Sequence, residues 1–80
     1  MSYGLRASIL LAADAYDGMW LPLHWLAQRV MAAPAAVKTA CDELAQAQLL
    51  QLGQVDGYDC AGVHVDAESR LCTDPGAPDA

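Results

Sequence analysis

The cysteine and histidine residues near the C-terminus are the first candidates for chemistry, because both residue types bind metal ions. Cys60 and His64 are four residues apart, and Cys72 follows them. On a regular strand Cys60 and His64 would share one face but lie ~13 Å apart, at ~3.3 Å per residue. One zinc ion cannot bind both unless the chain bends at Gly62. We therefore expect no metal site, with Cys60 a small buried residue and His64 on the surface.

No catalytic arrangement is evident in the sequence. The two histidines have no nucleophile or carboxylate at a spacing that would activate them, and no glycine-rich phosphate loop occurs. The three cysteines form no C-x-x-C motif. We expect a protein that is not an enzyme, needs no cofactor and keeps its cysteines reduced, as in the cytoplasm.

The other polar candidates are residues that could contact DNA. The outer face of one helix carries three residues that could reach phosphates or base edges: Lys38, Thr39 and Gln46. Arg29, on the preceding helix, could hold the DNA backbone. Asp42, one turn after Lys38, opposes DNA binding because it cancels the charge of Lys38 and would lie against the phosphates. The alternative is an ordinary solvated helix face.

Charge is distributed unevenly along the chain, whose formal net charge is −6. Residues 1–50 carry three Lys or Arg and four Asp or Glu, whereas residues 51–80 carry one and six. Phosphate backbones are bound through Lys and Arg. A chain with so few cations obtains little electrostatic affinity for DNA, so a basic protein is the alternative partner.

Trp25 is the strongest candidate for contact with another protein. On the helical wheel it lies beside His24 and Gln28, away from the apolar face of the same helix. An outward tryptophan is favoured at protein interfaces. The alternative is that Trp25 folds over the edge of the third helix or of the strand at Trp20.

Helical periodicity defines the elements that position these residues. We expect helices at about 3–16, from Pro22 to about Val30, and from Ala33 to about Gln48, with a short edge strand at 19–21. The residues expected to face the core are Leu5, Ile9, Ala12, Ala13, Tyr16, Leu23, Leu26, Ala27, Val30, Val37, Ala40, Cys41, Leu44 and Ala47.

A hairpin is predicted after the third helix. Asp56-Gly57 separates two β-prone runs, 49–55 and 58–65, and both central residues of a type I′ turn need positive φ. This turn would pair Val55 with Tyr58, Leu52 with Ala61 and Leu50 with Val63. Gly62 leaves a turn at Ala61-Gly62 as the alternative.

The segment PLHWLAQRV followed by APAAVKTACDELAQAQLL resembles the winged helix-turn-helix superfamily of bacterial transcription regulators. Together with the opening Tyr3-Gly4-Leu5-Arg6-Ala7, it is most similar to the iron–sulfur-sensing winged-helix repressors. The resemblance covers about residues 3–66 and implies an α+β fold, with three helices, a short strand and a two-stranded C-terminal wing.

The chain departs from this family in several places. Family members commonly carry Ser, Thr and Arg on the outer face of the third helix, where this chain has Ala35, Ala36, Lys38, Thr39 and Asp42. The glycine usual before the final Leu-Leu is Gln48. The long dimerisation helix and the cysteine triplet of the repressors are missing.

Two functional hypotheses follow. The first is a DNA-binding transcription regulator that acts as a homodimer through Lys38, Thr39, Arg29 and Gln46. The second is an acidic adaptor or phage-type inhibitor that uses Trp25 and His24 to bind a basic protein. In either case we expect one cytoplasmic domain at 1–72, a disordered acidic tail at 73–80, and neither a membrane span nor a signal peptide.

Overall fold

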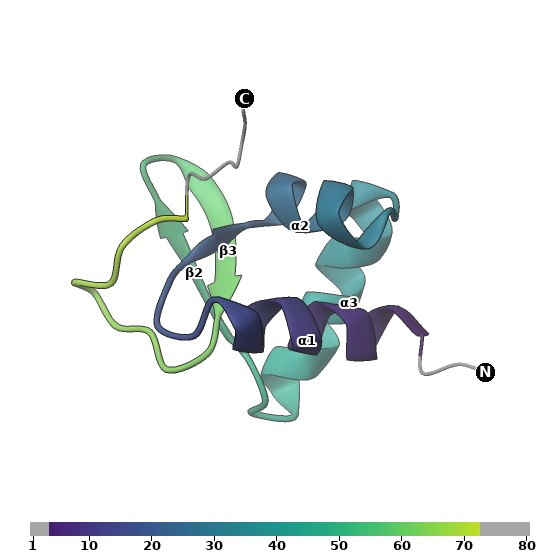
Figure 1. Ribbon diagram of the computed structural model, residues 1–80, viewed down its shortest axis with the longest axis horizontal. Coiled ribbons are helices and arrows are strands. Elements are labelled where there is room, and N and C mark those ends of the chain that lie inside the picture. The colour runs from purple at the N-terminus through teal and green to yellow at the C-terminus, as the bar shows by residue number, and fades with distance from the viewer. Residues whose placement is uncertain (1–3, 73–80) are drawn as a thin grey trace.

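Three helices and a three-stranded antiparallel sheet form residues 4–72, the part of the chain that the computed structural model describes (Figure 1). The elements are α1 (Gly4–Ala15), β1 (Leu21–Pro22), α2 (Leu23–Val30), α3 (Pro34–Gln46), β2 (Gln51–Val55) and β3 (Tyr58–Gly62). The expected α+β class and order of elements are confirmed. The architecture is compatible with a winged helix-turn-helix.

The apolar stripes of the helices meet in one core. As predicted, α1 buries Ile9, Ala12 and Ala13, and α3 buries Val37, Ala40, Cys41 and Leu44. Leu26 and Ala27 are the buried residues of α2. The prediction that Ala47 faces the core is wrong, because α3 ends at Gln46 and Ala47 is its exposed cap residue.

The ends of α3 follow from local backbone preferences. Pro34 occupies the first turn, where its missing N–H costs no hydrogen bond. After the helix, Gln48 adopts φ 63°, the left-handed conformation that glycine adopts without a steric cost. Gln48 therefore takes a backbone conformation that favours glycine, the residue that the sequence resemblance implies at this position.

The sheet has the order β1-β3-β2, and the β2–β3 hairpin has the predicted register. Val55 pairs with Tyr58 and Leu52 with Ala61, while Leu50 and Val63 lie just beyond the paired strands. Asp56 and Gly57 have φ values of 52° and 84°, as a type I′ turn requires.

The alternative turn at Ala61-Gly62 is wrong, because Gly62 is the last residue of β3. The absence of a side chain at Gly62 instead allows the backbone of Met19 to approach β3. A Cβ atom at Gly62 would lie 2.6 Å from the carbonyl oxygen of Met19, so only glycine permits this close approach.

Trp20 holds the chain that follows β3 against the sheet. Its Nε1 donates to the carbonyl oxygen of Asp66 at 2.9 Å, and its backbone pairs with Leu71 in an isolated parallel bridge. The strand was expected at 19–21, but only Leu21 and Pro22 pair within the sheet, as β1. The cause is that Trp20 pairs with the C-terminal segment instead of with β3.

Two expectations concern the ends of the chain and its relation to membranes. The predicted tail at 73–80 and the first residue of the predicted helix at 3–16 lie outside the described residues. Within residues 4–72, no helix is long and apolar enough to cross a membrane.

Candidate interaction surfaces

The outer face of α3 presents the residues that were predicted to contact DNA. Lys38, Thr39 and Gln46 are all exposed. The Nζ atom of Lys38 lies 3.9 Å from a carboxylate oxygen of Asp42, one turn further along the helix. An exposed pair of this kind contributes little to stability, but the carboxylate offsets the positive charge that Lys38 presents to a phosphate.

Arg29 does not lie with these residues. Its guanidinium carbon lies 5.1 Å from the ring centroid of Tyr16 and 5.4 Å from that of Trp25. Arg29 therefore forms cation–π contacts between α2 and the end of α1. In this position it is directed toward α1, and the structure does not bring it together with Lys38.

Trp25 closes the same edge of the domain. It is half-buried, packs against the core, and meets Tyr16 edge-to-face with ring centroids 5.1 Å apart. Trp25 was predicted to lie away from the apolar face of α2, but it packs partly against the core, and Tyr16 at the end of α1 contacts its indole. Neither α3 nor Trp20 is its partner in this ring contact. A role of Trp25 in binding a partner stays a prediction.

His24 is exposed and lies near the hairpin. Its ring centroid is 5.4 Å from that of Tyr58, the first residue of β3. This contact links the start of α2 to the hairpin. In Figure 1 the hairpin turn and the α2–α3 turn both lie along the upper side of the molecule, the first at the left and the second at the right. We call His24, Lys38, Thr39 and the 56–59 segment the α3–hairpin end.

The α3–hairpin end has no excess of positive charge. Asp56 and Asp59 are both exposed at the hairpin, against the single cation Lys38. Of the other cations, Arg6 forms an ion pair with Glu43 at 2.8 Å. Arg70 follows β3 in a segment that Figure 1 draws at the opposite edge of the molecule from α3.

An apolar groove, which the sequence reasoning missed, runs along α1. It has a volume of about 690 Å³ and is bordered by α1, by the α3–β2 connection and by the chain after β3. The residues that line it are Ala7, Leu10, Leu11, Asp14, Gln48, Leu49, Leu50, Gln51, Val63 and His64. The available signal was the pair of adjacent leucines in each of two segments, Leu10-Leu11 and Leu49-Leu50.

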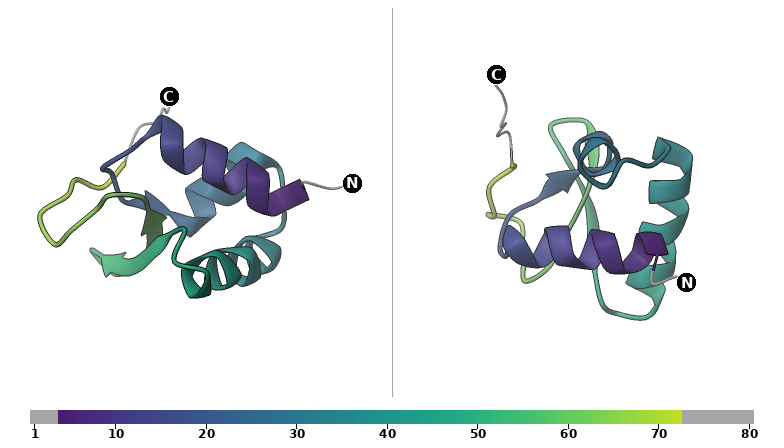
Figure 2. Two further views of the ribbon diagram at one scale, coloured as in Figure 1. Left: turned by 90° about the horizontal axis from the view of Figure 1, so that it is seen from below. Right: turned by 45° about the vertical axis from the view of Figure 1, so that its right-hand side comes forward.

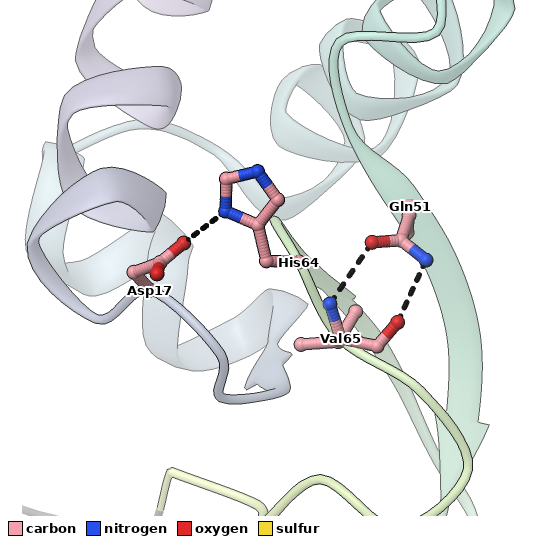
Figure 3. Close-up of polar contacts among 4 residues, drawn as sticks. All are labelled: Asp17, Gln51, His64 and Val65. Carbon is pink, nitrogen blue, oxygen red and sulfur yellow. Dashed lines mark hydrogen bonds and ion pairs between the residues drawn. The ribbon is translucent and has the colours of Figure 1, made fainter.

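Two polar contacts fix the chain at one end of this groove (Figure 3). The side chain of Gln51 donates to the carbonyl oxygen of Val65 at 2.8 Å and accepts from its N–H at 2.9 Å. His64 has φ 55°, and its Nδ1 lies 2.6 Å from a carboxylate oxygen of Asp17. The side-chain amide of Gln51 thus bonds both backbone groups of Val65, as the backbone of a neighbouring strand would, and joins the start of β2 to the chain after β3.

Two of the buried cysteines, Cys41 and Cys60, have the properties of packing residues. The pKa of the Cys41 thiol is raised from 9.0 to about 11, mainly by burial and secondly by the neighbouring Asp42, while Lys38 lowers it by less. Burial also raises the pKa of Cys60. A thiol with a raised pKa is a poor nucleophile and a poor metal ligand at neutral pH. Among residues 4–72, no group of three or more His, Cys, Asp or Glu could hold a metal ion.

Comparison of the chain with protein-family models, with curated proteins and with solved structures finds no match.

Proposed function

We propose that this chain is a winged-helix interaction module whose α3–hairpin end binds a basic protein surface. The single observation that supports this reading is the placement of the four Lys and Arg side chains. Arg6 and Lys38 are paired with acids, and Arg29 stacks on two aromatic rings, so three of the four cations already have a partner within the domain.

This placement disfavours duplex DNA on energetic grounds. Non-specific DNA affinity comes from phosphates neutralised by Lys and Arg, each of which adds about 0.9 to the slope of affinity against salt. Lys38 is the one cation among the residues that define the α3–hairpin end, which also include the carboxylates of Asp56 and Asp59. The same acids complement a positively charged protein.

The experiment that tests this proposal measures two probes at the same end. Fluorescence anisotropy at low salt would compare a 30-bp duplex with an arginine-rich peptide. We expect binding of the peptide and none of the duplex. Tight, salt-dependent binding of the duplex would overturn the proposal.

A matched pair of variants locates the binding surface. The double variant Asp56→Asn/Asp59→Asn should weaken peptide binding several-fold, because it removes both hairpin carboxylates and keeps side chains that suit the turn. The variant Asp66→Asn/Glu68→Gln changes the net charge equally in the loop after β3. Equal losses in both variants would show that only net charge matters.

DNA binding by a dimer is the second candidate, and the exposure of Lys38 and Thr39 on α3 favours it. If it holds, Lys38→Ala should weaken binding to all sequences and reduce the salt slope by about one unit. An unchanged affinity of this variant would exclude α3 as the DNA-contacting helix.

A further inference from the structure

One helix carries two apolar faces. The core face of α1 includes Ile9, Ala12 and Ala13. A second stripe, formed by Ala7, Leu10, Leu11 and Asp14 at positions i, i+3, i+4 and i+7, lines the groove, and its half-buried Leu10 also packs against the core. A helix at the surface of a single domain needs only one apolar face.

The second face is left open to solvent. Leu11 is 72% exposed on α1, and Leu49 is 54% exposed on the opposite wall of the groove. Exposed leucines on facing walls of one apolar groove are typical of a contact with another molecule. The segment at 73–80, TDPGAPDA, has no large apolar side chain with which to cover it.

We propose that the groove binds a second copy of this chain, with the two α1 helices packed antiparallel around a twofold axis near Leu10 and Leu11. A twofold contact uses the same patch on both copies, so that patch must contain both protrusions and hollows. The α1 stripe has both features, since Leu11 protrudes beside Ala7, the smallest side chain in it.

The charges on α1 support this orientation. Arg6 lies near the start of the helix, and Asp14 and Asp17 lie at and after its end. In the antiparallel arrangement Leu10 of one copy faces Leu11 of the other. The same alignment sets Arg6 of one copy beside Asp14 of the other. This contact between Arg6 and Asp14 forms twice in the dimer.

Arg6 can make this contact without giving up its own partner. One guanidinium nitrogen is 2.8 Å from Glu43, and the side chain is 61% exposed. A guanidinium has five N–H donors, so it can join a carboxylate of each copy. Antiparallel packing also brings opposite ends of the two helix dipoles together.

A basic protein partner fits this groove less well than a second copy does. Helix α1 carries exposed charges of both signs, Arg6 near its start and Asp14 near its end, so a second α1 in antiparallel orientation complements it. This interface lies along α1 and is independent of the α3–hairpin end, so the two proposals fail separately.

Sedimentation equilibrium of the full chain over a range of concentrations tests the proposal. We expect a reversible monomer–dimer equilibrium that Leu11→Glu weakens by about tenfold or more. Leu52→Glu is the matched control, because Leu52 is 42% exposed on β2 and does not line the groove. Thermal melts of both variants check that they fold.

A charge exchange tests the antiparallel orientation. Arg6→Glu and Asp14→Arg should each weaken the homodimer, because each sets like charges against one another at both ends. The double variant Arg6→Glu/Asp14→Arg should dimerise again, since opposite charges then meet in reversed positions. In a parallel pair each residue would face its own equivalent, so each single variant would replace one like-charged pair by another and would not weaken the dimer.

Three results would overturn the proposal. A chain that remains monomeric at all concentrations has no such interface. A Leu52→Glu variant that dissociates as readily as Leu11→Glu would place the contact elsewhere. A double charge variant that fails to recover would exclude the antiparallel arrangement.

Discussion

Two hydrophobic clusters hold the described residues together, and they are built in different ways. The helical cluster contains thirteen buried residues, of which five are alanine. The sheet cluster contains three, Trp20, Cys60 and Val65, with Val55 and Leu71 packed against them. The first cluster distributes its packing over many small side chains, whereas the second depends on one large side chain.

This difference determines how each cluster responds to change. Removing one alanine-sized contact from the helical cluster leaves most of its packing in place. Trp20 makes a hydrogen bond to Asp66 and lies against the backbone of Gly53, where a Cβ atom would be only 2.9 Å from the indole. We infer that neighbouring side chains cannot fill the space that a smaller residue at position 20 would leave in the sheet cluster.

The largest effect is expected for Trp20→Ala. Loss of the indole should lower the free energy of unfolding by about 3–5 kcal/mol, through lost burial and an unfilled cavity. Urea denaturation followed by circular dichroism measures it. A loss of under 1 kcal/mol would show that the two clusters tolerate change equally.

The helical cluster should become pH-sensitive in alkaline solution. The neutral Cys41 thiol is favoured in the folded state, with a pKa of about 11 against 9.0 for the ordinary group. Stability is therefore complete below pH 9 and falls as the pH rises toward 11. At ~1.4 kcal/mol for each unit, the loss reaches roughly 2–3 kcal/mol.

Denaturation curves at pH 8 and pH 10.5 measure this loss. Cys41→Ala is the control, since it lacks the thiol and should show a smaller decrease over the same interval. If both proteins lose equal stability, the alkaline sensitivity comes from other groups.

Trp25→Ala should have an intermediate effect, because Trp25 is half-buried at the edge of the helical cluster. We expect a loss of about 1–2 kcal/mol in the free energy of unfolding. Arg29→Ala removes the cation–π contact alone and should cost about 0.5–1 kcal/mol. If Trp25→Ala is as damaging as Trp20→Ala, Trp25 is a full core residue.

Sedimentation of Trp25→Ala separates two positions for an interface. The α1 groove predicts unchanged self-association, whereas the sequence-based prediction of a contact at Trp25 requires weaker association. Leu11→Glu, measured beside it, should give the opposite result in each case.

The smallest effect is expected at the connection between the clusters. Gln48→Gly should stabilise the domain by about 0.5–1 kcal/mol, since glycine adopts φ 63° without the steric cost of a side chain. Gln46→Gly, two residues earlier and within α3, should instead destabilise it by up to about 1 kcal/mol. Thermal melts compare them, and destabilisation by Gln48→Gly would contradict the backbone argument.

Local patterns were sufficient to predict the helices and the hairpin. The periodicity of Val37, Ala40, Cys41 and Leu44 specified the buried face of α3, and Asp56-Gly57 specified the turn. Both patterns are formed by residues that lie close together in the sequence, so they can be recognised from the sequence alone.

Contacts between distant segments were not predictable in the same way. The cover of Trp25 by Tyr16, the position of Arg29 and the groove beside Leu11 all depend on how α1 packs against other elements. A helical wheel places Trp25 on an outer face but does not reveal which neighbour reaches it. For the same reason, the candidate surfaces were less predictable than the fold.

The pairing of β1 with β3 affects how the chain folds. Leu21 pairs with Ala61, forty positions away, whereas β2 and β3 are joined by a two-residue turn. Closing the longer loop costs more chain entropy, and a two-residue strand repays little of it. The hairpin can therefore form early. Strand β1 joins it only when the helices between β1 and β2 have packed, so we expect the helices and the sheet to complete folding in a single cooperative step.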